Sequence, residues 1–276
     1  MVTPNFYLIF GILGLIFGSF FNVVIHRLPK ILDANISKKK PNVSVLKSIS
    51  YPNSHCPSCK KSIEWFDNIP LLSWVFLLGK CRFCSKKISP LYFIVEFITM
   101  AFFVFCFWQY GISWATLVWI SFFSLLVLLF FIDLTSFYLP NLLTFPLAIL
   151  GIVCSLLGFT NIDIKTSVIG SIFGFLIFFV INKLYRIWRG IDGFGDADKI
   201  LLAGLGGWFG FKSLYPIIMF SSFFGLGFAL IMLALGQKFQ VESKLPFGPF
   251  LILSGILVYV HLHIYSLTFM RFFYEI

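Results

Sequence analysis

The chain has 276 residues, of which 59% are hydrophobic, 20% are aromatic and only 12% are charged. A soluble domain is about 45–50% apolar and about 25% charged. The composition therefore excludes a disordered chain, a coiled coil and a soluble nucleic-acid-binding protein, despite the net charge of +10. It predicts an all-α protein that crosses a membrane several times, with membrane lipid but no nucleic acid among its partners.

Apolar runs along the chain predict about eight transmembrane helices, because a bilayer core of about 30 Å requires about 20 apolar residues per helix. The first run lacks a cleavage-site pattern and leads directly into His26 and Arg27, so we expect a retained helix and not a signal peptide. The sixth run is short and rich in glycine, which leaves seven helices as an alternative. The runs cover residues 6–25, 91–110, 113–132, 139–159, 166–181, 200–211, 214–235 and 247–267.

The basic residues predict the orientation of these helices. Residues 27–90 hold twelve of the twenty-one Lys and Arg residues, four more lie in 183–199 and two in 236–244. Loops rich in Lys and Arg face the cytoplasm. With eight helices and the N-terminus outside, eighteen basic residues lie on the cytoplasmic side and three on the other. The positive charge is thus explained by orientation in the membrane.

The only long polar stretch lies between the first and second helices and carries four cysteines in two pairs. Cys56 and Cys59 form one CxxC pair, and Cys81 and Cys84 form the other. Four thiolates at this spacing suit a tetrahedral, structural Zn site, and a cytoplasmic location disfavours disulfides. We therefore expect a small cytoplasmic zinc-binding domain.

Acidic residues at the ends of apolar runs are candidates for chemistry, because a carboxylate near hydrocarbon is costly. Asp133 ends the third run, and Asp196 and Asp198 precede the sixth. Two carboxylates held close together share a proton and supply an acid and a base, as aspartyl proteolysis requires. The alternative is that Asp133 lies in an interfacial turn and that Asp196 or Asp198 caps a helix. Glu96 is more simply an interhelical partner.

Nearly the whole chain resembles the type IV prepilin peptidases, which are GxGD-type aspartyl proteases also called prepilin leader peptidase/N-methyltransferases. The resemblance rests on sequence motifs in both halves of the chain. They are GSFFNVVIHRLP at 18–29, the two CxxC pairs, NIP at 68–70, SW at 73–74, GKCRFC at 79–84, ISP at 88–90 with Tyr92 and Glu96, and the segments 133–141 and 193–210.

The second aspartate motif offers two candidates for the catalytic aspartate, Asp196 and Asp198. Residues 193–196 read GFGD, which spells the family signature with Asp196 at its end. An ungapped match anchored on residues 201–208 instead aligns the family aspartate with Asp198, which is our first choice. Asp196 then becomes an accessory carboxylate.

The resemblance implies a bifunctional enzyme of the bacterial cytoplasmic (inner) membrane, with its active site at the cytoplasmic face. It would cleave the basic leader from type IV prepilins or pseudopilins after a Gly, with Asp133 and Asp198 as catalytic residues. It would then methylate the new N-terminus with S-adenosylmethionine, and Gly79 and Lys80 are the candidate contacts of this methyl donor. The implied division is a first helix at 1–29, a zinc-binding and methyltransferase loop at 30–90 and a peptidase domain at 91–276.

Substrate recognition is expected to be local, because the basic cytoplasmic loops cannot attract a basic leader over long range. We predict that Asp192 and Asp196 receive the lysines of the leader, with Glu64 or Asp67 as further candidates. Two other functions stay open at this point. One is a peptidase without methylation, and the other is a noncatalytic membrane scaffold that docks a secretion partner through its zinc domain.

Overall fold

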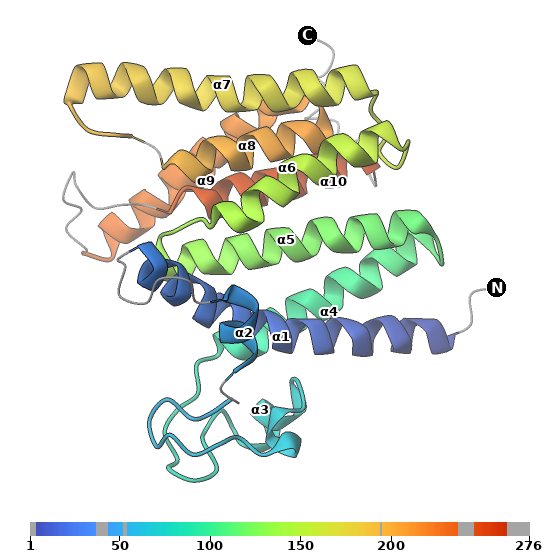
Figure 1. Cartoon of the computed structure of the whole chain (residues 1–276), viewed down its shortest axis with the longest axis vertical. Coiled ribbons are helices and arrows are strands. Elements are labelled where there is room, and N and C mark those ends of the chain that lie inside the picture. Colours follow the sequence, from blue (N-terminus) through green and yellow to red (C-terminus); the bar gives the residue numbers. More distant parts are fainter. Residues whose placement is uncertain (1–3, 37–43, 52–53, 194, 237–245, 264–276) are drawn as a thin grey trace. The chain divides into compact units, whose positions relative to one another are not determined.

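The computed structural model describes residues 4–36, 44–51, 54–193, 195–236 and 246–263, and the regular elements in these ranges are helices apart from two isolated bridges (Figure 1). A helix lies at each of the eight expected positions, which confirms the predicted all-α membrane fold. These helices are α1 (Pro4–Ile36), α4 (Leu91–Tyr110), α5 (Trp114–Ser136), α6 (Asn141–Leu156), α7 (Ile164–Arg189), α8 (Asp196–Phe209), α9 (Leu214–Ala234) and α10 (Gly248–His263). The expected end of the last helix at residue 267 lies outside the described residues.

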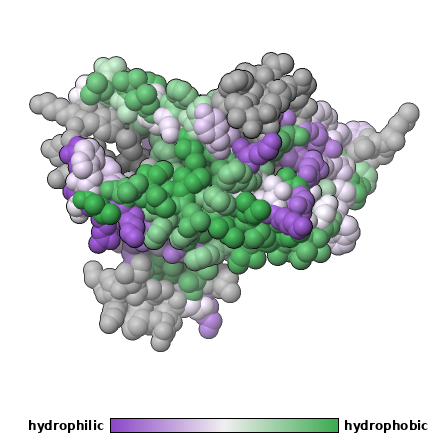
Figure 2. Space-filling view, turned by 90° about the horizontal axis from the view of Figure 1, so that it is seen from above, coloured by the Kyte–Doolittle hydropathy of each residue, from purple (hydrophilic) through white to green (hydrophobic). Residues whose placement is uncertain are grey.

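Five of the described helices are long and apolar enough to cross a membrane: α1, α4, α5, α7 and α9. The helices α6 and α10 are apolar but have only 16 residues each, and α8 has 14. The face of the molecule in Figure 2 carries broad hydrophobic areas that are interrupted by patches of hydrophilic residues. The chain is therefore a multi-pass membrane protein.

The chain forms two compact units, and the first is Met1–Phe131. In this unit α1 packs against α4 along a seam of glycines on α1. A Cβ atom at Gly14 would lie 2.6 Å from the Cα of Met100, and one at Gly18 would lie 2.7 Å from the Cα of Glu96. Small residues thus let the two backbones approach closely, as is usual between membrane helices.

The polar segment between α1 and α4 belongs to the first unit and holds three short helices. They are α2 (Val45–Ser50), the 3-10 helix η1 (Trp65–Asn68) and α3 (Leu72–Phe76).

The second unit, Ile132–Ile276, is built around α8, which packs against both α6 and α7. Gly170 of α7 and Gly206 of α8 meet so closely that neither has room for a Cβ atom. On the other side, the indole of Trp208 donates a hydrogen bond to the carbonyl of Leu147, 2.9 Å away. Every residue of α8 from Leu201 onward is buried. These contacts hold α8 in place. The helix that carries the Asp196 and Asp198 carboxylates is therefore rigid.

Candidate active site and metal centre

Asp133 lies in the last turn of α5 and is buried. Its Oδ2 atom makes no hydrogen bond of good geometry within the described residues, although the backbone of Gly248 interacts with the carboxylate. The backbone of Gly248, the first residue of α10, packs against this oxygen, because a Cβ atom at Gly248 would lie only 2.6 Å from it. A buried polar atom without a partner is costly, and such atoms occur where a site awaits a ligand or performs chemistry.

Asp198 lies in the first turn of α8, where its Oδ2 accepts a hydrogen bond from the backbone N–H of Gly195, 3.0 Å away. The positive end of the helix dipole favours a carboxylate at this position. The preceding loop is held by Asn182 of α7, whose Oδ1 accepts a hydrogen bond of 2.7 Å from the N–H of Gly193. Asp198 therefore caps α8, as one reading of the sequence expected, and the cap fixes its carboxylate in place.

Asp133 and Asp198 come from distant parts of the sequence, yet their carboxylates lie close enough to interact electrostatically. Asp196 is oriented differently: its side chain is 91% exposed and its Oδ1 lies 2.6 Å from Nζ of Lys199. The structure thus brings Asp133 together with Asp198, and brings Asp196 together with Lys199.

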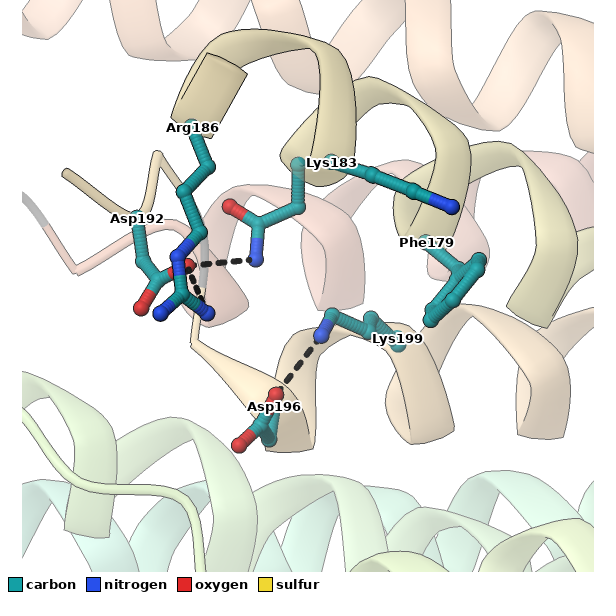
Figure 3. Close-up of a pocket in the computed structure, with 7 residues that line it drawn as sticks. Phe179, Lys183, Arg186, Asp192, Asp196 and Lys199 are labelled. Carbon is teal, nitrogen blue, oxygen red and sulfur yellow. Dashed lines mark hydrogen bonds and ion pairs between the residues drawn. The ribbon is translucent and has the colours of Figure 1, made fainter. Parts of the chain in front are cut away.

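Asp192 and Asp196 line a cavity of about 370 Å³ (Figure 3). The Oδ1 atom of Asp192 accepts a hydrogen bond of 3.3 Å from Asn182 and lies 3.9 Å from Arg186. Each carboxylate uses Oδ1 for these contacts, and each has a second oxygen on its outer side (Figure 3). The other lining residues are Phe179, Lys183 and Lys199. The cavity therefore carries charges of both signs.

The four cysteines of the polar segment form one cluster in the first unit. All four Sγ atoms lie within 4.8 Å of one another, and those of Cys56 and Cys84 are 3.8 Å apart. A tetrahedral Zn with bonds of about 2.3 Å to sulfur sets neighbouring sulfurs about 3.8 Å apart. The cluster therefore fits a metal ion with a complete shell of four thiolates.

The two cysteine pairs lie on turns with the same hydrogen-bond pattern. The N–H of Cys56 donates to the carbonyl of Lys61 at 3.0 Å, and the N–H of Cys81 donates to the carbonyl of Lys86 at 2.9 Å. In addition, the N–H groups of Cys59 and Ser58 lower the pKa of the Cys56 thiol to about 6. Cys56 is therefore mostly a thiolate at neutral pH, which is the form that binds metal.

An ion pair joins the second cysteine turn to η1. The guanidinium of Arg82 donates hydrogen bonds of 2.8 and 2.6 Å to the carboxylate of Asp67 and holds the pKa of this carboxyl below its usual value. The pair thus stays ionised at neutral pH and links the turn to the aromatic residues of η1.

Gly79 has a structural role beside the second cysteine pair. Its φ angle is +66°, and a Cβ atom would lie 2.9 Å from the indole ring of Trp74. Both facts require glycine at this position. Lys80 follows and is exposed. Of the two candidate contacts of the methyl donor, Lys80 is therefore the one that can be altered without disturbing the fold.

Glu96 is an interhelical partner, as the sequence suggested. This buried residue of α4 accepts a long hydrogen bond of 3.5 Å from Asn22 of α1 and a short one of 2.8 Å from the N–H of Leu71. The second contact links the polar segment to a membrane helix, which sequence patterns did not predict.

Asn182, Lys199 and Gly248 also shape the site but were not singled out from the sequence. Asn182 could have been noticed as a polar residue directly after an apolar run. Gly248 lies between Pro246 and Pro249, a pattern that indicates a special backbone position.

Most of the chain is similar in sequence to proteins of one known family. Residues 12–110 match the bacterial peptidase A24 N-terminal domain, and residues 120–230 match the type IV leader peptidase family. The chain is 35% identical to the prepilin leader peptidase/N-methyltransferase of Neisseria gonorrhoeae, over 90% of this chain and 88% of that protein. It is 36% identical to the protein of that name in Aeromonas hydrophila and 34% identical to the one in Pseudomonas aeruginosa, in each case over 88% of this chain and 86% of the relative. No solved structure matches the chain.

Proposed function

Because this chain belongs to the type IV leader peptidase family, we propose that it removes the leader from type IV prepilins or pseudopilins and then methylates the new N-terminus. The substrate is a membrane-anchored protein with a short basic leader that ends in Gly. The observation that supports the peptidase assignment is the electrostatic interaction between Asp133, which is buried, and Asp198, together with the lack of a well-formed hydrogen bond at Oδ2 of Asp133.

Asp133 and Asp198 would divide the chemistry between a base and an acid. One carboxylate, ionised, takes a proton from water while the water oxygen attacks the scissile carbonyl carbon. The other, protonated, donates a hydrogen bond to the carbonyl oxygen as negative charge develops there. Collapse of the intermediate breaks the C–N bond, and the leaving amine takes a proton from the carboxyl pair. The assignment of Asp198 over Asp196 is supported by the Lys199 contact, which engages Asp196 instead.

The cysteine cluster would hold zinc in a structural role. Four thiolates fill a tetrahedral shell, so no position is left for a catalytic water. The metal replaces the apolar core that so small a segment lacks.

Methylation would use S-adenosylmethionine, with Lys80 near this donor and Gly79 shaping the turn. When bound, this donor would supply a methyl group to the amine nitrogen of the new N-terminus, which would lose a proton. If a Lys80→Ala variant methylates as fast as the parent, Lys80 does not contribute to binding of the methyl donor.

Asp192 and Asp196 would receive basic residues of the leader. Support comes from the exposure of both side chains and from their outer oxygens, which remain accessible beside the cavity (Figure 3). Replacing each Asp by Lys should raise KM for a prepilin more than it lowers kcat. The control is Asp33→Lys, which changes an exposed acid of α1 outside the cavity. Unchanged KM in both cavity variants would reject this part of the proposal.

The distribution of basic residues supports an orientation with the N-terminus outside the bacterial inner membrane. Residues 27–90 and the loop before α8 then face the cytoplasm, where leaders are exposed. The peptidase and methyltransferase sites would lie on the same side of the membrane, as sequential action on one N-terminus requires.

The test is incubation of the purified full chain with a prepilin, with and without S-adenosylmethionine, followed by mass spectrometry of the product. We expect loss of the leader in both reactions and a gain of one methyl group only with the donor. Leader removal without methylation would show that the chain is a peptidase and not a methyltransferase. An uncleaved prepilin in both reactions would overturn the proposed function.

A further inference from the structure

The short helix α3 carries large apolar side chains that no described part of the protein covers. Phe76 and Leu78 are each 81% exposed, Leu72 is 54% exposed and Val75 is 51% exposed. So many exposed apolar residues on seven consecutive positions are unusual for a segment in water, and such a patch indicates a contact with a partner or a membrane.

The start of α3 is tied to a membrane helix. The N–H of Leu71 donates its 2.8 Å hydrogen bond to Oε2 of Glu96, which lies five residues after the first residue of α4. At a rise of 1.5 Å per residue, this contact lies about 7.5 Å along α4 from its first residue. The Trp74 ring of α3 also lies 5.3 Å from the ring of Phe93 on α4. The helix α3 therefore lies alongside the first turns of α4, not beyond its end.

The orientation of α3 is fixed by contacts on its inner side. Trp74 points inward, where its ring packs on Gly79 and its carbonyl accepts a hydrogen bond of 2.8 Å from the Gly79 N–H. Leu71 and Leu78, at the two ends of the segment, both have positive φ angles, of 60° and 51°. A bulky residue in this conformation costs free energy that Gly or Asn would avoid. An exposed Leu78 side chain in water gains no free energy that would offset this cost. Burial of the same side chain in lipid would offset it.

The charges that follow α3 in the sequence are of one sign. Residues 72–90 contain four basic residues and no acidic residue, and Lys80, Lys86 and Lys87 are all exposed. A short apolar helix flanked by exposed lysines has the composition of a segment that lies in a membrane interface and contacts anionic headgroups.

We propose that α3 and Leu78 insert into the membrane leaflet that surrounds the start of α4. Phe76, Leu78, Leu72 and Val75 contact acyl chains, and the lysines that follow contact anionic lipid headgroups. This insertion holds the metal-binding turns at the membrane surface. The occupant of the apolar face is lipid, and neither a second copy of the chain nor a protein partner is needed to cover it.

The test is photocrosslinking of the full chain in nanodiscs that contain anionic phospholipid with a radiolabel in its acyl chains. The photoreactive amino acid p-benzoylphenylalanine replaces Phe76 in one variant and Leu78 in another. Leu8 of α1, which is 66% exposed, serves as the lipid-facing reference, and the exposed Ser58 of the first cysteine turn serves as the aqueous reference. Retention of the metal shows that each variant is folded, and Leu72 replaces any position that fails this check.

We expect lipid labelling at positions 76 and 78 similar to that at position 8 and at least several-fold above that at position 58. Labelling at 76 and 78 no higher than at 58, while position 8 is labelled, would overturn the proposal. Crosslinks from 76 or 78 to a second protein chain in place of lipid would also overturn it, because they would assign the face to a protein contact.

Discussion

Asp196 and Asp198 lie two positions apart at the start of α8, and a helix of 3.6 residues per turn separates such side chains by about 200°. Only one of them can therefore face Asp133. The contacts of Asp196 with Lys199 and of Asp198 with Gly195 point the two carboxylates to different surroundings. The GFGD sequence at residues 193–196 ends at Asp196. The sequence motif alone would therefore select Asp196, whereas Asp198 is the residue that interacts with Asp133.

Gly248 offers a test of the site that leaves both carboxylates in place. Because a Cβ atom would lie 2.6 Å from Oδ2 of Asp133, Gly248→Ala must displace either α10 or the carboxylate. A misplacement of about 1 Å can cost about 100-fold in rate, and we expect a loss of leader cleavage of this order. The measurement is the initial rate of prepilin cleavage by the purified variant.

The matched control for this variant is Gly227→Ala in α9, where a Cβ atom would meet no other atom within 4 Å. It should cleave at the parental rate, since Ala is the better helix former. Parental cleavage by Gly248→Ala as well would show that the packing around Asp133 does not matter for catalysis.

At the scale of elements, the two cysteine turns are equivalent in their hydrogen bonds, and the metal joins them. A strong chelator should therefore open the segment between α1 and α4 while α1 and α4 remain packed through their glycine seam. We expect rapid trypsin cleavage at Lys80 and Arg82 after chelation and slow cleavage before it. Gel analysis with mass spectrometry of the fragments measures this difference.

Methylation should fall together with this protease resistance, whereas leader cleavage should persist, because both aspartates belong to the second unit. Replacing either Cys56 or Cys81 by Ser should reproduce the chelated state to the same extent. If the segment stays protease-resistant after chelation and in both Cys→Ser variants, the metal does not stabilise its fold.

At the scale of the whole molecule, the orientation follows from the basic residues and can be tested directly. Lys165, at the start of α7, is expected on the outer face of the inner membrane, and Lys30, near the end of α1, on its cytoplasmic face. A membrane-impermeant maleimide added to intact cells should label a Lys165→Cys variant and leave Lys30→Cys unlabelled until the cells are permeabilised. The parent chain provides the background from its own cysteines. The reverse pattern would invert the orientation.

Much of this molecule could be predicted from its sequence, because its strongest signals are local. The length of the apolar runs predicted eight helices, and the CxxC spacing predicted the cluster of four cysteines. The electrostatic interaction of Asp133 with Asp198 joins distant segments of the second unit, and no periodicity in the sequence predicts it. The same is true of the Leu71 contact with Glu96, which gives α3 its place beside α4.

The contact between Asp133 and Asp198 is the claim on which the peptidase function depends. The most direct test is the rate of prepilin cleavage by Asp133→Asn, Asp198→Asn and Asp196→Asn, each purified and measured beside the parent chain. We expect losses of about 1,000-fold or more in the first two variants and nearly parental cleavage by Asp196→Asn. Parental cleavage by Asp133→Asn or Asp198→Asn would contradict the claim.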